Sequence, residues 1–127
     1  MKKNLLLLIL LLAISHLMMA QGKPVLSFEK QEYDLGVIKF TSKSKKIRFN
    51  YTFKNTGSAP LIINSVQTSC GCTISEWTKK PVQAGTKGHV YAILELKGKI
   101  GLIRKTLFVY SNANKQVVQL YIKGMIE

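Results

Sequence analysis

The stretch that decides the fold is Lys46–Lys54, which reads K-I-R-F-N-Y-T-F-K. Its apolar residues occupy every second position: Ile47, Phe49, Tyr51 and Phe53. Successive side chains of a strand point to opposite faces, so a period of two places one row on a core and the other in solvent. The stretch therefore predicts a half-buried β-strand with an apolar inner face and a polar outer face.

The same alternation recurs at His89–Leu96 and Val118–Lys123. Less regular apolar runs follow the same plan at Val25–Phe28, Tyr33–Ile38, Leu61–Val66 and Ile103–Ser111. Turn-forming residues at 55–60, 84–88, 97–101 and 111–114 separate these runs, and no helical period occurs after Ala20. Short strands at this spacing predict an all-β fold, an immunoglobulin-like antiparallel β-sandwich of 7–8 strands.

The first twenty residues have the layout of a secretory signal peptide. A basic start at Lys2 and Lys3 precedes an unbroken apolar run from Leu5 to Ile14, and a small residue follows at Ala20. The run is shorter than the roughly 20 apolar residues that a membrane span needs. We expect cleavage after Ala20, with an uncleaved anchor as the alternative. The sequence thus predicts a signal peptide at 1–20 and one domain at 21–127, exported to the periplasm or the cell surface.

Composition excludes several protein classes. The chain has 127 residues, of which 46% are hydrophobic and 20% are charged, unlike a disordered protein. Nineteen Lys and Arg against six Asp and Glu give a net charge of +13, and residues 21–127 keep +11 because the signal removes only Lys2 and Lys3. There are two Cys, two His and a single Asp, Asp34. The sequence therefore offers few of the residues that a metal cluster or a Ser-His-Asp triad needs.

Two longer motifs resemble a known family. Residues 53–63 read F-K-N-T-G-S-A-P-L-I-I, and residues 69–73 read S-C-G-C-T. Further matching positions are Trp77, Pro81, Gly85, Gly88 and Ser111-Asn112. From about Phe28 to Ile126 the chain resembles domain-of-unknown-function family 1573, which comprises secreted, Hydin-like bacterial Ig-like domains. The resemblance implies a sandwich fold and an exported location, but no activity. Ala84 departs from the family, which has Pro there.

The Cys70-Gly71-Cys72 triplet is the one group of neighbouring residues in the sequence whose side chains suggest redox or metal chemistry. Two Cys in an exported protein are by default a disulfide. Residues two apart in a strand lie about 6.6 Å apart, so a bridge needs a bend that Gly71 allows. If one alternation runs from Val66 to Ile74, both thiols instead point the same way and are small buried hydrophobes.

Three roles remain for the thiols Cys70 and Cys72. We place a structural role first, as thiols or a local disulfide, and redox exchange second. Metal binding by Cys70 and Cys72 comes third: a Zn site needs about four ligands, and only His89 is added, although a two-coordinate Cu(I) site fits soft thiolates. His89 itself lies opposite the apolar row of its strand, which indicates a solvated side chain. No cofactor is expected.

Basic residues cluster in two segments. One contains Lys39, Lys43, Lys45, Lys46 and Arg48, and the other contains Lys97, Lys99, Arg104 and Lys105. Lys46, Arg48 and Lys54 share the outward row of one strand. Such a row keeps a sheet soluble and discourages edge pairing, or it attracts anionic envelope components. No nucleic-acid motif is present, and Trp77 is expected in the core or capping an end of the sandwich.

Two functions follow from these observations. The first is an exported, non-enzymatic module of the cell envelope that binds a protein or glycan partner with anionic groups, and contacts a membrane peripherally if at all. The alternative is a thiol-redox or Cu/Zn-binding protein centred on Cys70 and Cys72. The carboxylates are scattered, and no paired acid and base is offered.

Overall fold

The computed structural model describes residues 1–19, 22–39, 46–69, 73–96, 98, 100–113 and 117–127. Helix α1 (Lys2–Met19) comes first, and eight strands follow within these ranges. They are β1 (Leu26–Phe28), β2 (Glu32–Ile38), β3 (Lys46–Asn55), β4 (Ile63–Thr68), β5 (Thr73–Trp77), β6 (Lys87–Glu95), β7 (Gly101–Ser111) and β8 (Val117–Ile126).

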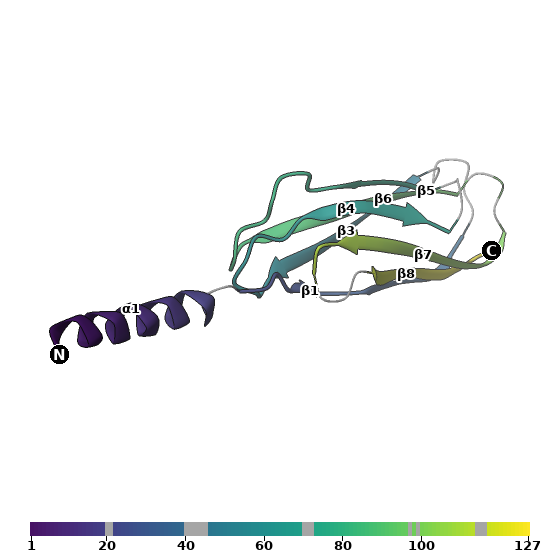
Figure 1. Cartoon of the computed structure of the whole chain (residues 1–127). Helices are drawn as coiled ribbons and strands as arrows, with labels where there is room; N and C mark the ends of the chain where they lie inside the picture. Colours follow the sequence, from purple (N-terminus) through teal and green to yellow (C-terminus); the bar gives the residue numbers. More distant parts are fainter. Residues whose placement is uncertain (20–21, 40–45, 70–72, 97, 99, 114–116) are drawn as a thin grey trace.

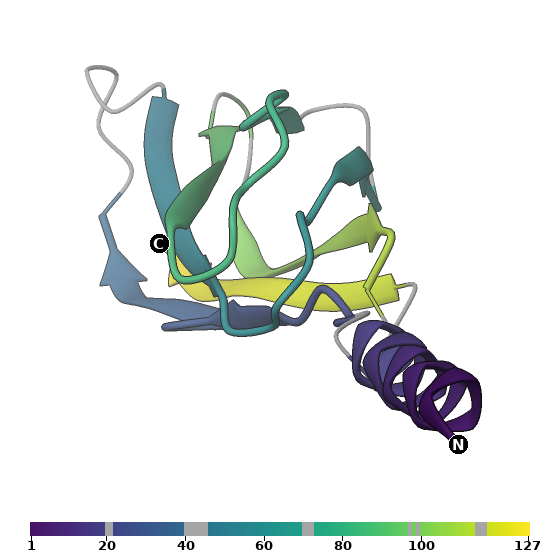
Figure 2. The same cartoon turned by 60° about the vertical axis from the view of Figure 1, so that its left-hand side comes forward.

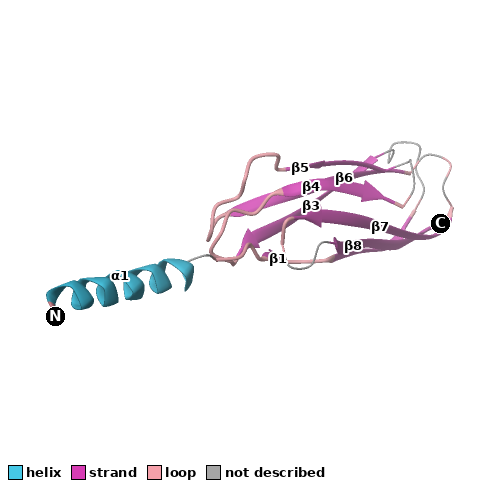
Figure 3. Ribbon diagram, in the orientation of Figure 1, coloured by secondary structure: helices cyan, strands magenta, loops and turns pink. Residues whose placement is uncertain are grey.

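The strands form two four-stranded sheets that face each other (Figure 1, Figure 3). Sheet A has the order β1-β3-β6-β5, and sheet B has the order β2-β8-β7-β4. The order of sheet A, and the β8-β7-β4 part of sheet B, match the two sheets of an immunoglobulin constant-type domain. The predicted immunoglobulin-like β-sandwich of 7–8 strands is confirmed.

One strand pair departs from the antiparallel prediction. β2 runs parallel to β8, whereas the other described pairs are antiparallel. Only residues 29–31 separate β1 in sheet A from β2 in sheet B. The chain therefore crosses between the sheets without reversing, and it meets β8 in the parallel direction.

The core lies between the two sheets, as the alternation in β3 predicts. Phe49, Tyr51 and Phe53 are at most 3% exposed, while Lys46 and Lys54 on the same strand are exposed. Inward residues of the neighbouring and opposite strands also belong to this core, among them Val90, Ala92, Leu94, Leu107, Val109, Leu120 and Ile122. Burial of these apolar side chains is the main source of the fold's stability.

Helix α1 points away from the sandwich in both views (Figure 1, Figure 2). Its Leu and Ile side chains from Leu5 to Leu12 are exposed. Among the described residues, no helix is long and apolar enough to cross a membrane.

Candidate functional site

Asn55 is the buried centre of the N-T-G motif. Its side chain is fully buried, and its amide nitrogen donates to the carbonyls of Ala59 at 2.7 Å and Val82 at 2.9 Å. Its amide oxygen accepts from the backbone N–H of Val25 at 3.3 Å and of Gly57 at 3.0 Å. These four bonds join three separate segments, so the role of Asn55 is structural.

Asn112, a second residue of the predicted motif positions, acts in the same way. Its side-chain oxygen accepts from the N–H of Ile62 at 2.8 Å, and its side-chain nitrogen donates to the carbonyl of Pro60 at 3.2 Å. The loop after β3 is therefore tied by Asn55 to Val82, in the segment between β5 and β6, and by Asn112 to the end of β7. Asn55 and Asn112 thus hold loops of the sandwich in place.

Gly57 and Gly88 lie so close to neighbouring atoms that a side chain would not fit. A Cβ on Gly57 would lie 2.1 Å from the carbonyl oxygen of Lys23, and a Cβ on Gly88 would lie 2.3 Å from the ring of Phe53. The register pairs Gly88 directly with Phe53. Both glycines therefore serve packing.

Cys70, Gly71 and Cys72, the predicted thiol site, lie outside the described residues. The residues beside them are placed: β4 ends at Thr68 in sheet B, and β5 begins at Thr73 in sheet A. The condition that one alternation runs from Val66 to Ile74 is therefore not met, because the chain changes sheets between β4 and β5. Ser69 stays attached to β7, since its N–H donates to the carbonyl of Thr106 at 3.0 Å.

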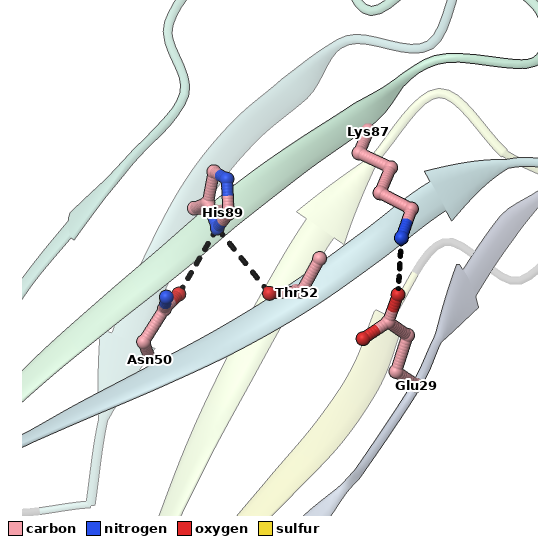
Figure 4. A network of polar contacts seen from close by, with 5 residues as sticks. All are labelled: Glu29, Asn50, Thr52, Lys87 and His89. Carbon is pink, nitrogen blue, oxygen red and sulfur yellow. Dashed lines mark hydrogen bonds and ion pairs between the residues drawn. The ribbon is translucent and has the colours of Figure 1, made fainter.

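His89 lies on the outward row of its strand, as its pattern predicts, and Trp77 lies against the core, as expected. Trp77 is partly buried against the core, and the Lys79 ammonium lies 2.9 Å from its ring centroid. His89 faces outward from β6, and its Nδ1 lies 3.1 Å from Asn50 Oδ1 and 3.4 Å from Thr52 Oγ1 (Figure 4). The described residues contain no group of three or more His, Cys, Asp or Glu that could hold a metal ion.

The predicted basic row is present on the outer face of sheet A. Lys46, Arg48 and Lys54 are all exposed along β3, as the alternation requires. Lys87 of β6 pairs in register with Lys54 and forms a 2.8 Å ion pair with Glu29 (Figure 4).

The second basic segment does not join this row. Arg104 is exposed on the outer face of sheet B, in register with Lys123 of β8. Lys43, Lys45, Lys97 and Lys99 lie outside the described residues. Among the described residues of the two groups, Lys46 and Arg48 thus lie on the outer face of sheet A, whereas Arg104 lies on the outer face of sheet B.

Sequence reasoning missed a hollow on the outer face of sheet A. A space of about 160 Å³ is lined by Arg48, Glu76, Tyr91 and Ile93, which come from three strands. A signal was available, because Tyr91 and Ile93 occupy positions of the outward row of β6, where polar residues are expected. Their partners in the hollow depend on strand register, which the sequence does not display.

A larger hollow of about 420 Å³ lies on the outer face of sheet B. Its lining includes Leu102, which is 83% exposed, together with Met125, Asp34, Arg104 and Lys123. Lys123 forms a 2.9 Å ion pair with Glu32, and this contact raises the pKa of Lys123.

Tyr51 links the two sheets through the core. Its hydroxyl donates to the carbonyl of Tyr121 in β8 at 2.9 Å. Burial is the largest cause of a raised Tyr51 pKa, and the neighbouring Tyr33 and Glu32 raise it further. The phenol is therefore held in its neutral form.

Solved structures share the fold at low sequence identity. A protein of unknown function from Porphyromonas gingivalis W83 is 14% identical with a TM-score of 0.68, over 80% of this chain and 46% of that one. The secreted serine protease VesC from Vibrio cholerae is 17% identical with a TM-score of 0.60, over 80% and 23%. A Bacteroides ovatus GH5 xyloglucanase is 13% identical with a TM-score of 0.51, over 81% and 19%.

The chain spans less than half the length of these three proteins, and at such identity the likeness concerns the fold alone. No curated protein is significantly similar to the chain. Residues 26–126 match the model of a family described as a protein of unknown function (DUF1573). This match covers the whole sandwich from β1 to β8, so the chain belongs to the DUF1573 family.

Proposed function

We propose that the chain is an exported, non-enzymatic immunoglobulin-like module of the bacterial cell envelope. It binds a protein or glycan partner that carries anionic groups, through the outer face of sheet A. The observation that carries this proposal is the exposed row of Lys46, Arg48 and Lys54 along β3.

The spacing of the row suits an extended anionic partner. Lys46 and Lys54 are eight residues apart, which corresponds to about 26 Å along a strand. Within the described ranges, no ion pair involves Arg48 or Lys54. Their charges therefore remain available to a partner, and the net charge of +11 on residues 21–127 adds long-range attraction.

Export is supported by the amino terminus. Lys2 and Lys3 precede the apolar run from Leu5 to Ile14, and these apolar side chains cover none of the sandwich core. A removable secretion signal accounts for an apolar helix that the domain does not bury.

The contacts of His89 support a binding role over catalysis. Its Nδ1 faces an amide oxygen and a hydroxyl, whereas a general base is usually oriented by a carboxylate. The alternative function, thiol redox or Cu/Zn binding at Cys70 and Cys72, stays a prediction, since both residues lie outside the described part of the chain.

The test is co-sedimentation of the purified chain with isolated bacterial envelopes at about 50 mM and about 500 mM NaCl. We expect binding that weakens strongly at the higher salt concentration, because exposed charges are screened there. Reversal of the row in the double variant Lys46→Glu, Lys54→Glu should reduce binding at low salt by about tenfold or more.

A matched control reverses two charges on the opposite face. The variant Arg104→Glu, Lys123→Glu changes the net charge by the same amount in sheet B and should bind within about threefold of the unmodified chain. Equal losses in both double variants would show that net charge alone acts, and would reject the row as the binding surface.

A further inference from the structure

The outer face of β6 carries a row of side chains in the middle of sheet A. His89, Tyr91 and Ile93 are each half-buried there. β3 lies on one side of β6 and β5 on the other. The register places Asn50 of β3 and Glu76 of β5 directly beside Tyr91. Polar groups thus flank the tyrosine on both sides.

The hollow of about 160 Å³ beside Tyr91 contains two opposite charges. Arg48 and Glu76 both line it and both are exposed. Neither side chain forms a hydrogen bond or an ion pair with any other residue in the described part of the chain. The space between them is therefore open to a ligand that offers acceptors to the guanidinium and donors to the carboxylate.

Tyr91 is held in place before any ligand arrives. Its ring stacks on His89 with 5.7 Å between the ring centroids and 21° between the planes. The His89 ring is oriented in turn by Asn50 and Thr52 (Figure 4). Because an amide oxygen only accepts, Nδ1–H of His89 donates to Asn50 Oδ1. An aromatic surface fixed in this way loses little conformational freedom on binding.

We infer that this hollow binds one pyranose ring of a glycan. Each sugar hydroxyl both donates and accepts hydrogen bonds, so neighbouring hydroxyls donate to the Glu76 carboxylate and accept from the Arg48 guanidinium. The apolar C–H face of the ring packs on Tyr91, beside Ile93. The inference rests on the proposed binding function and selects the glycan as its partner class.

A zwitterionic ligand is the main competitor. Its carboxylate and ammonium groups pair with Arg48 and Glu76 equally well. A small zwitterion such as glycylglycine offers no flat apolar face, however, and Tyr91 and Ile93 form the apolar part of the lining. The mixed lining therefore favours a sugar ring over a small zwitterion.

The experiment is an NMR titration of the ¹⁵N-labelled full chain with neutral oligosaccharides of glucose, galactose, mannose and N-acetylglucosamine. At least one should shift amide signals of β5 and β6 around Glu76 and Tyr91. Tyr91→Ala should raise the Kd for the oligosaccharide that binds by about tenfold or more. Tyr91→Phe, which keeps the aromatic ring, should leave this Kd within about threefold. Tyr110→Ala, which removes a tyrosine from the outer face of sheet B, is the matched control and should leave the Kd unchanged.

Several outcomes would overturn the inference. The first is that no oligosaccharide shifts any amide signal, and the second is that the shifts are confined to sheet B. The third is an unchanged Kd in Tyr91→Ala. The fourth is that glycylglycine shifts amide signals at the hollow while sugars do not. Sugar binding that survives about 0.5 M NaCl separates this site from the charged row, whose binding is salt-sensitive. If sugars fail while the row reversal still abolishes envelope binding, the glycan site is rejected and the proposed function stands.

Discussion

Single polar residues decide how the loops of this sandwich are arranged. A buried asparagine is costly unless its amide finds partners for both donors and for its oxygen. Asn55 meets this condition with bonds to Val25, Gly57, Ala59 and Val82. The role of Asn55 in the N-T-G stretch is therefore to hold the surrounding loops together.

Replacement of Asn55 by alanine should be strongly destabilising. It leaves two backbone donors and two backbone acceptors without their partner, at about 1–3 kcal/mol for each buried group that water does not reach. We expect the free energy of unfolding in urea to fall by about 3 kcal/mol or more. Asn112→Ala, at an exposed position, should cost about 1 kcal/mol. Equal losses in the two variants would contradict the central role of Asn55.

We expect Cys70 and Cys72 to contribute to the stability of the fold and not to binding. We expect Cys70→Ser and Cys72→Ser to change the free energy of unfolding and to leave envelope binding within about twofold. Thiol titration of native and denatured chain would show whether the pair is bridged or unreactive. A reduction potential more oxidising than about −200 mV, in the range of thiol oxidants, would favour the redox alternative.

At the scale of elements, β3 combines the core and the proposed binding face. Its inward row contributes Phe49, Tyr51 and Phe53 to the core, and its outward row presents Lys46, Arg48 and Lys54. Tyr51 also crosses to sheet B through its hydroxyl bond to Tyr121. Packing of the two sheets thus determines how rigidly the basic row is held.

Burial of the Tyr51 phenol predicts a specific sensitivity to alkali. The pKa of Tyr51 is raised above its ordinary value of about 10, so the folded state holds the phenol proton more tightly than the unfolded state. This contribution to stability is complete below pH of about 10 and is lost as the pH rises further.

Tyr51→Phe should therefore unfold more easily at neutral pH, by about 1 kcal/mol, yet lose less stability between pH of about 9 and about 11. Urea unfolding at both pH values measures the difference. Parallel decreases for the variant and the unmodified chain would show that other groups cause the alkaline loss.

Elements with clean alternation were predictable from the sequence. β3, β6 and β8 coincide closely with the stretches whose period is two. β5 was missed: its T-I-S-E-W sequence has no regular alternation, and its separation from β4 depends on a change of sheet. The parallel pairing of β2 also escapes the pattern, because strand neighbours are determined by the tertiary fold.

The residues of the candidate site also differ in how far the sequence predicts them. Lys46, Arg48 and Lys54 lie on one strand, so periodicity alone places them on one face. Arg48, Glu76 and Tyr91 meet only through the register of three strands, and those pairings join residues far apart in the sequence.

At the scale of the whole molecule, we expect cleavage to separate helix α1 from the sandwich. We expect Edman or mass-spectrometric sequencing of protein recovered from expressing cells to begin at Gln21, in the periplasmic or surface fraction. Protein that keeps Met1 and remains with the inner membrane would instead support the anchor alternative. Recovery of protein that keeps Met1 in the cytoplasmic fraction would reject the prediction that the chain is exported.

We propose that the outer face of sheet A meets the envelope partner. Lysine acetylation footprinting of the chain, free and bound to isolated envelopes, tests this most directly, because each lysine reports on its own surroundings. Lys46, Lys54 and Lys87 should become protected on binding, while Lys105 and Lys123 in sheet B keep their free reactivity. Protection of Lys105 and Lys123, with Lys46 and Lys54 still reactive, would contradict the account.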